Sequence, residues 1–250
     1  MFETFPLLWY NLDMQQYFSN KKENNILYFD SEDLHHIKNV MRIKEESEVI
    51  VNFEGTSYIC RMCEDLKSAS IISVYKTKQE GPFVTAYIPV LNDEKTSFII
   101  EKCTELGVNN FILVQYERCK FIINKDKLEK KLMRYNKIAK EASEQSRRTS
   151  VPKVTGVIKV DSIESSSGVN ILCSLDEYNV KSINKVLNSN SICDKINIVF
   201  GPEGGLTNKE EDLLVSIGYT KTSLGSNVLR TETVLLTVCS ICLLYTSDAA

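Results

Sequence analysis

A short apolar segment followed by a cluster of glycines constrains the fold more than any other feature of this sequence. Ile196–Phe200 carries the apolar run, and Gly201-Pro202-Glu203-Gly204-Gly205 follows it directly. Thr207-Asn208-Lys209-Glu210 comes next with the spacing of a capping box, in which a threonine caps a helix and a glutamate lies at its third position. An apolar run between polar residues is typical of a central strand of a parallel sheet, buried on both faces. The order therefore predicts a strand, a tight loop and a helix of an α/β fold.

The same alternation of strands and helices begins at Phe83. Phe83–Leu91 and Asn110–Gln115 have the composition of strands, and Asp93–Leu106 between them has helical spacing and ends at Gly107. This order favours a parallel sheet. The further expected elements are a helix at Lys127–Gln145, strands near Val154 and at Val169–Leu175 and Tyr219–Leu224, a short helix at Lys181–Leu187, and an apolar C-terminal helix capped by Thr231.

The first third of the chain has a different pattern of short strands. The expected strands are Ile26–Phe29, Val49–Phe53, Tyr58–Met62 and Ala69–Tyr75, with Ser31 capping a helix after the first of them. The stretch at 76–82 becomes polar and ends in Gly-Pro, which is typical of a linker. We therefore predict two domains, a small β-rich domain at 1–76 and an α/β domain at 77–250.

Composition excludes several classes of protein. Of the 250 residues, 43% are hydrophobic and 25% charged, as in a soluble globular protein and unlike a collagen-like or disordered chain. The longest apolar stretch, Val234–Tyr245, is shorter than the ~20 residues of a membrane-spanning helix. The N-terminus lacks the features of a secretory signal, so we expect a cytosolic protein.

The eight cysteines are expected to be reduced thiols rather than a disulfide framework. Cys60/Cys63 and Cys239/Cys242 have Cys-x-x-Cys spacing, which a four-ligand zinc site would use on tight turns. The first pair lies in a β-like stretch and the second in a helix-like stretch, so we expect no metal site.

Charge is unevenly distributed along the chain. The whole sequence has 30 Lys and Arg against 33 Asp and Glu, whereas Arg118–Lys153 alone has a net charge of +8 and leaves −11 on the remainder. A basic block on an acidic protein indicates a polyanionic partner. A solvated helix face with convenient lysine spacing explains the block equally well.

Two loops are the candidates for chemistry. The glycines of 201–205 allow positive φ and a close backbone approach to a ligand, at the strand end where open α/β sheets usually bind ligands; a plain tight turn is the alternative. The stretch 224–233 leads into the C-terminal helix at the same sheet edge, with Arg230 and Glu232 near the helix start. An ordinary helix start, with Arg230 as the salt-bridge partner of Glu232, is the alternative for this loop.

These two stretches, with four others in the same order along the chain, closely resemble the RsmE family. Its members are SPOUT-class methyltransferases that modify N3 of a uridine in small-subunit ribosomal RNA. The other matching stretches are His35–Arg42, Glu101–Val108, Glu117-Arg118, and Glu141–Arg148 followed by Val151-Pro152. Val234 departs from the small residue that the family usually has there. Leu243–Ala250 does not resemble the family's ending, from which we expect a truncated or non-native tail.

The resemblance implies an α/β fold with two parts. These are a C-terminal SPOUT-type α/β domain with a trefoil knot and an N-terminal PUA-like β-barrel for RNA docking. It also implies a homodimer, S-adenosylmethionine as the methyl donor, and 16S ribosomal RNA, within the 30S subunit, as the substrate. The cofactor would be bound by Gly201, Pro202, Glu203, Gly204, Gly205, Leu224, Gly225, Leu229, Arg230, Thr231 and Thr233.

Methylation of uracil N3 requires the loss of a proton and leaves negative charge on the ring. Arg230 could stabilise that charge, and Glu232 or Glu203 could accept the proton; the sequence does not choose among them. The candidate RNA-binding residues are His36, Arg42, Lys44, Arg118, Arg147 and Arg148. Two alternatives remain: another SPOUT enzyme, such as a ribose 2′-O or guanine N1 methyltransferase, and a noncatalytic ribosomal RNA-binding assembly protein.

Overall fold

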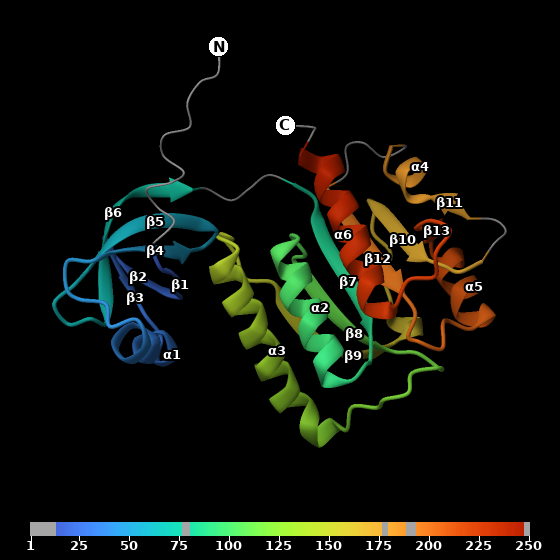
Figure 1. Cartoon of the computed structure of the whole chain (residues 1–250), viewed down its shortest axis with the longest axis horizontal. Coiled ribbons are helices and arrows are strands. Elements are labelled where there is room, and N and C mark those ends of the chain that lie inside the picture. The colour runs from blue at the N-terminus through green and yellow to red at the C-terminus, as the bar shows by residue number, and fades with distance from the viewer. Residues whose placement is uncertain (1–13, 77–80, 177–179, 189–193, 248–250) are drawn as a thin grey trace, which may run out of the picture. The chain divides into compact units, whose positions relative to one another are not determined.

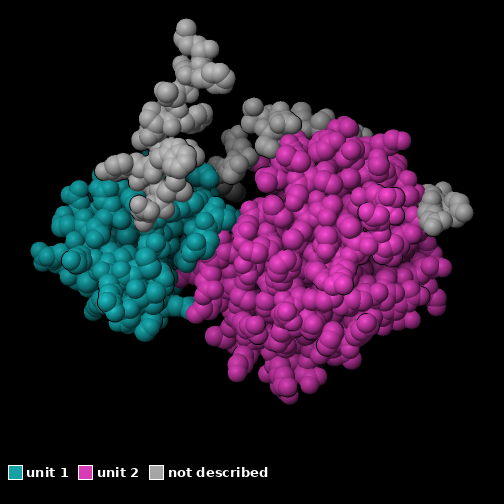
Figure 2. Space-filling model, in the orientation of Figure 1, with its two compact units in different colours: residues 1–79, 143–150 teal, residues 80–142, 151–250 magenta. Residues whose placement is uncertain are grey.

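The computed structural model describes residues 14–76, 81–176, 180–188 and 194–247 (Figure 1). The chain forms two compact units: unit 1 consists of residues 1–79 and 143–150, and unit 2 of residues 80–142 and 151–250 (Figure 2). The domain division at residues 76 and 77 stays a prediction. The return of 143–150 to unit 1 has no signal in the sequence. Part of the predicted linker (77–80), Cys193 and the tail 248–250 lie outside the described residues.

Unit 1 contains a six-stranded sheet in the order β1-β4-β5-β6-β3-β2. Its pairs are antiparallel except β1 with β4, which is parallel. The four expected strands are confirmed. The additional β1 and β2 escaped prediction because each has three residues and all of β2 is exposed. The bounds are β1 Gln16–Phe18, β2 Lys21–Glu23, β3 Ile26–Tyr28, β4 Glu48–Phe53, β5 Thr56–Met62 and β6 Ser68–Lys76.

A short helix follows β3 in unit 1. Helix α1 (Ser31–His35) continues into a π-helical turn, η1 (His36–Val40). The expected cap at Ser31 is wrong, because the Asp30 carboxylate accepts hydrogen bonds from the backbone N–H groups of Glu32 and Asp33 at 2.9 and 2.8 Å. Asp30 has extended backbone geometry and Ser31 is the first helical residue.

Unit 2 is built on a seven-stranded sheet in the order β11-β13-β10-β12-β7-β8-β9. Every pair is parallel, which confirms the parallel sheet, and β12 lies in its centre as expected. Side chains of β12 alternate between two cores: Ile196, Ile198 and Phe200 face one, and Val199 faces the other. The bounds are β7 Phe83–Pro89, β8 Asn110–Gln115, β9 Lys153–Lys159, β10 Val169–Cys173, β11 Lys181–Ser182, β12 Lys195–Phe200 and β13 Thr220–Ser223.

Helices cover both faces of this sheet. Residues of α2, α3, α4 and α6 belong to the larger core, whereas α5 contributes Leu214 to the core on the opposite face. The expected helices are confirmed, and so is the capping box of α5 formed by Thr207 and Glu210. Asn92 is the N-cap of α2. The bounds are α2 Asp93–Glu105, α3 Lys125–Gln145, η2 Val160–Ser162, α4 Ile183–Asn188, α5 Asn208–Ser216 and α6 Thr231–Ser247.

The C-terminal helix α6 returns across the sheet. It follows β13 but packs against α2 and β12, which lie on the other side of β10 (Figure 1). This return is the course that the expected trefoil knot requires; the knot itself stays a prediction. The expected cap at Thr231 is wrong, because the Arg230 carbonyl accepts the N–H groups of Thr233 and Val234 at 2.8 and 3.1 Å, which makes Arg230 the N-cap.

No helix of the described residues is long and apolar enough to span a membrane. The seven described cysteines are free thiols. In the same part of the chain, histidine, cysteine and acidic side chains form no group of three or more that could hold a metal ion.

Candidate functional site

Three loops meet at the carboxyl edge of the sheet in unit 2. One joins β7 to α2; the second, which we term the glycine loop (201–207), joins β12 to α5; the third, the exposed loop (224–230), joins β13 to α6. Because the strands are parallel, their carboxyl ends lie at one edge, which is where ligands bind in open α/β sheets. The candidate site therefore combines the loop between β7 and α2 with two loops that lie more than 100 residues later in the sequence.

Lys95 links the two predicted catalytic carboxylates. Its Nζ lies 2.9 Å from Oε1 of Glu203, in the glycine loop, and 3.1 Å from Oε2 of Glu232, in the first turn of α6. The side chain of Lys95 is 28% exposed, so the three groups are partly shielded from water. This bridge brings the two predicted loops together and shows that Glu232 pairs with Lys95. For Arg230, no ion pair is recorded among the residues that the structure describes.

The bridge keeps all three groups charged at neutral pH. Hydrogen bonds to Glu203 and Glu232 raise the pKa of Lys95. Burial alone would raise the pKa of the Glu203 carboxyl, but Lys95 and the backbone more than offset it, so the pKa is lowered. Burial acts likewise on Glu232, where the backbone, Lys95 and Arg230 together lower the pKa. Both glutamates are therefore carboxylates that can accept a hydrogen bond from a ligand.

The glycine loop is held from several sides. The Gly205 N–H donates to the Pro202 carbonyl at 2.8 Å, with Gly205 at φ +70°. The Arg118 Nη1 donates to the carbonyls of Gly204 at 3.2 Å and Leu206 at 3.1 Å. A Cβ on Gly204 would lie 3.0 Å from Cβ of Arg118, so any larger residue at this position would press on Arg118. The loop is thus preformed.

Buried Glu210 completes this support. One of its carboxylate oxygens accepts the N–H and hydroxyl of Thr207, at 2.8 and 3.0 Å, and the other accepts the N–H of Glu117 at 2.8 Å. Glu210 is only 6% exposed. It therefore ties the loop after β8 to the start of α5.

The exposed loop is held at few points. Ser223 Oγ accepts from the N–H of Gly225 and donates to its carbonyl, both at 3.3 Å. Among the described residues, no hydrogen-bond partner is recorded for the backbone N–H groups of 226–230. Val228 is 77% exposed. Of the predicted cofactor-binding residues at this end, Gly225 and Arg230 are exposed, Leu224 and Leu229 half-buried, Thr231 buried and Thr233 exposed.

The predicted RNA-binding residues of unit 1 differ in exposure. Arg42 and Lys44 are exposed, whereas the His36 ring packs edge-to-face on Tyr17 and its Nδ1 lies 3.1 Å from the Tyr17 hydroxyl. Arg147 and Arg148 are half-buried. Burial lowers the pKa of Arg148 to about 10, which leaves its guanidinium charged at neutral pH.

The sequence pattern missed Lys95 and the role of Glu210. Lys95 lies in a segment that reads only as the start of an amphipathic helix, and nothing in its neighbours marks a partner more than 100 residues away. Glu210 was recognised as part of a capping box, but its second oxygen is used by the Glu117 backbone. The Glu117-Arg118 pair, one of the stretches that resemble the RsmE family, was a signal for this contact of Glu210.

Comparison with known proteins identifies the family. An RNA methyltransferase domain model matches residues 79–243, and an RNA methyltransferase PUA domain model matches residues 29–69. The ribosomal RNA small subunit methyltransferase E of Bacillus subtilis is 32% identical over 238 residues, which covers 88% of this chain and 92% of that protein. The chain belongs to the ribosomal RNA small subunit methyltransferase E family.

Other family members agree with this assignment. The Mesomycoplasma hyopneumoniae protein of the same name is 30% identical and covers 90% of this chain and 99% of its own. The crystal structure of the Neisseria gonorrhoeae protein of that name, bound to S-adenosyl methionine, is 24% identical with a TM-score of 0.79, covering 91% of this chain and 96% of that one. This likeness shows the fold, a SPOUT-type α/β domain preceded by a PUA-like curled sheet.

Proposed function

We propose that this chain transfers a methyl group from S-adenosylmethionine to N3 of a uridine in 16S ribosomal RNA of the small subunit. The observation that carries the proposal is the Lys95 bridge, which holds Glu203 and Glu232 together at the sheet edge beside Arg230. Family membership and the bound S-adenosyl methionine of the Neisseria gonorrhoeae protein support it.

The residues at this edge fit S-adenosylmethionine. The N–H groups of 226–230, which have no partner among the described residues, offer hydrogen-bond donors to a nucleoside, and exposed Val228 offers an apolar contact. The carboxylates of Glu203 and Glu232 favour a cationic ligand nearby. When bound, S-adenosylmethionine supplies an electrophilic methyl group. We propose that the backbones of the glycine loop and the exposed loop hold its nucleoside.

Arg230 is the proposed group that stabilises charge on the uracil ring. Its side chain is exposed at the start of α6, where the helix dipole is positive as well. Both features favour the negative charge that develops on the uracil oxygens as N3 loses its proton. Glu203 or Glu232 would accept that proton, directly or through a water molecule.

We also propose that the enzyme is a cytoplasmic homodimer that acts on the 30S subunit. Arg42 and Lys44 in unit 1 are exposed cations suited to phosphate contacts, as are the Arg118 nitrogens other than Nη1. Phosphate contacts position a nucleic acid, and base contacts specify it. His36, Arg147 and Arg148 are the remaining proposed contacts. Sedimentation of the purified chain tests the dimer.

The activity is tested with labelled S-adenosylmethionine and small-subunit particles that lack the modification. After incubation, the RNA is digested to nucleosides and separated. We expect label in 3-methyluridine. Label in a 2′-O-methylnucleoside or in 1-methylguanosine would favour another SPOUT enzyme, and binding without label a noncatalytic protein.

The role of Arg230 is tested by Arg230→Ala, with Arg230→Lys as the conservative variant. We expect Arg230→Ala to lower turnover by about 100-fold while the affinity for S-adenosylmethionine, measured by calorimetry, changes little. Arg230→Lys should retain part of the activity. Equal loss of turnover and cofactor affinity in Arg230→Ala would contradict a role in the transition state.

A further inference from the structure

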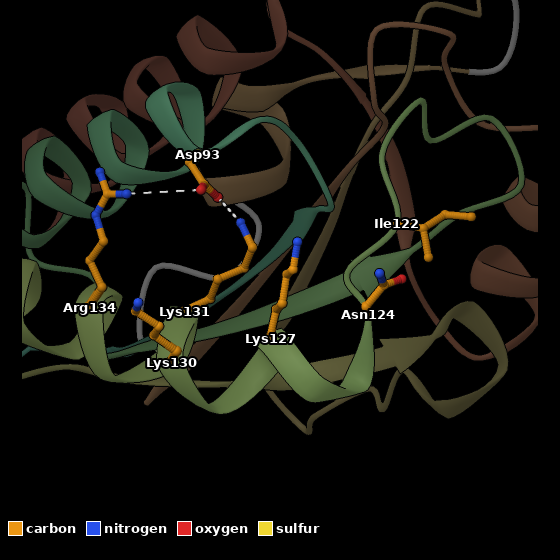
Figure 3. A pocket seen from close by; sticks show the side chains of 7 residues that line it. All are labelled: Asp93, Ile122, Asn124, Lys127, Lys130, Lys131 and Arg134. Carbon is orange, nitrogen blue, oxygen red and sulfur yellow. Dashed lines mark hydrogen bonds and ion pairs between the residues drawn. The ribbon is translucent and has the colours of Figure 1, made fainter.

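A basic cavity of about 690 Å³ opens beside the start of α2, apart from the Lys95 bridge. Its volume lies in the range of roughly 300–1,000 Å³ that is usual for ligand sites. Four of its residues are cations on α3, and the others come from the loop after β8 and from α2 (Figure 3). The lining residues are Asp93, Ile122, Asn124, Lys127, Lys130, Lys131 and Arg134.

The four cations form one face of a helix. Lys127, Lys130, Lys131 and Arg134 have the spacing i, i+3, i+4 and i+7, which places them on the same side of α3. Asp126 and Glu129 are on the same helix, but neither lines the cavity. Asp93 contributes the single carboxylate of the lining, so the cavity keeps a net charge of +3.

Asp93 positions two of the cations and leaves the other two for a ligand. Its carboxylate pairs with Lys131 and lies 3.9 Å from Nη1 of Arg134 (Figure 3). It also accepts a hydrogen bond from the Tyr135 hydroxyl at 2.7 Å. For Lys127 and Lys130, no ion pair is recorded among the described residues. Asp93 thus holds Lys131 and Arg134 on one side of the cavity, whereas Lys127 and Lys130 remain available to a ligand.

The position of the cavity relates it to the candidate site. Asp93 and Lys95 lie two residues apart in the first turn of α2, so their side chains leave the helix about 200° apart. Lys95 faces the two glutamates, and Asp93 faces α3. The Lys95 bridge and the cavity therefore flank the same end of α2, on different sides of the helix.

We propose that this cavity binds phosphodiester groups of the RNA strand next to the target uridine, an inference that rests on the proposed function. Lys127 and Lys130 contact the phosphate oxygens, and Lys131 and Arg134 add positive potential. Ile122, which is 78% exposed on the cavity wall, offers an apolar contact to a ribose or base. A polymer with regular negative charge fits this lining better than a neutral or cationic ligand.

The test compares two double variants of the full chain that remove the same charge. Lys127→Gln with Lys130→Gln neutralises the two lysines that remain available to a ligand. The control, Lys153→Gln with Lys195→Gln, neutralises two exposed lysines at the amino ends of β9 and β12, the sheet edge opposite the candidate site. Binding of a labelled fragment of small-subunit ribosomal RNA is measured by fluorescence anisotropy from 50 to 200 mM salt, and folding by thermal unfolding.

We expect the cavity variant to bind RNA at least about tenfold more weakly at 0.1 M salt, with the salt slope smaller by roughly 1.4 to 1.8. In the cavity variant, KM for RNA should rise, whereas kcat and the affinity for S-adenosylmethionine should stay unchanged. The control should behave as wild type, and Lys127→Arg with Lys130→Arg should restore binding.

The outcomes separate this inference from the proposed function. If wild type forms 3-methyluridine and the cavity variant matches the control, the inference is wrong and the proposed function stands. If inorganic phosphate binds in a way that depends on Lys127 and Lys130 while RNA affinity does not, the cavity is a free-anion site and the inference is also wrong. If wild type neither binds RNA nor methylates it, both fail.

Discussion

The glycine loop and the exposed loop lie at the same sheet edge but are stabilised in opposite ways. Arg118, Glu210 and a buried Pro202 hold the glycine loop. Only Ser223 holds the exposed loop at its start, and the N–H groups of 226–230 have no partner recorded in the described part of the chain. The difference indicates that the glycine loop is ordered before a ligand binds, whereas the exposed loop gains its hydrogen bonds from the ligand. Because the glycine loop is already ordered, binding a ligand against it costs less entropy.

The largest effect on this comparison is expected from Glu210→Ala. The substitution removes the acceptor of three hydrogen bonds and half of the capping box, so the free energy of unfolding should fall by about 3 kcal/mol. Urea unfolding measures it. Asp212→Ala, an exposed position on the same helix, is the control and should change stability by less than about 0.5 kcal/mol. Similar losses in both variants would contradict a preformed glycine loop.

A smaller effect is expected from a substitution by alanine in each loop, which adds a methyl group to the glycine loop and removes a hydroxyl group from the exposed loop. Gly204→Ala places a Cβ 3.0 Å from that of Arg118 and should cost about 1 to 2 kcal/mol, because Arg118, which holds the loop, must then shift. Ser226→Ala in the exposed loop should cost less than about 0.5 kcal/mol. Thermal unfolding of both variants provides the measurement; an equal cost would remove the distinction between the loops.

Lys95→Met tests the link between the loops and its dependence on pH. At pH 7 we expect a loss of about 1 kcal/mol, since the pair is partly exposed. Glu203 and Glu232 have lowered pKa values, so their stabilisation is present above the ordinary glutamate pKa and is lost as pH falls through the lowered values. The raised pKa of Lys95 keeps the bridge intact as pH rises, until pH passes that raised value.

Stability measured against pH should therefore show wild type and Lys95→Met differing at neutral pH and converging in acid. Lys209→Met, at an exposed lysine of α5, is the control and should follow wild type at every pH. A difference between wild type and Lys95→Met that persists unchanged in acid would mean that packing, not charge, accounts for the loss.

The smallest effect on the unliganded protein is expected from Val228→Ser. Because Val228 is 77% exposed, stability should change by less than about 0.5 kcal/mol. Affinity for S-adenosylmethionine, measured by calorimetry, should fall by roughly fivefold, equivalent to about 1 kcal/mol of apolar burial lost on binding. Unchanged affinity would exclude Val228 from the ligand contact.

The elements of unit 2 were predictable because each carries its own local signal. The buried run at 196–200, the glycines after it and the Thr207–Glu210 box specify strand, loop and helix within fifteen residues. The predicted helix caps, Ser31 in unit 1 and Thr231 in unit 2, were wrong by one residue, because Asp30 and Arg230 are the N-caps. Choosing between neighbouring polar residues depends on backbone geometry that the pattern does not contain.

The candidate site was predictable only in part. The two loops were found by their glycines and their place after strands, and the structure brings Glu203 and Glu232 together. The residue that joins them, Lys95, could not be found, since its contacts span 108 and 137 positions of sequence. The same holds for the basic cavity, which needs α3 packed beside the start of α2.

The hydrogen bonds of Gln16 have a consequence for the synthesis of the chain. Its Nε2 donates to the carbonyl of Ser143 at 3.3 Å and to that of Arg148 at 2.8 Å, within unit 1. Neither unit is therefore a continuous stretch of polypeptide. As the ribosome elongates the chain from its N-terminus, unit 1 cannot acquire its last segment until residue 150 has left the exit tunnel, by which time residues 80–142 of unit 2 have already been translated.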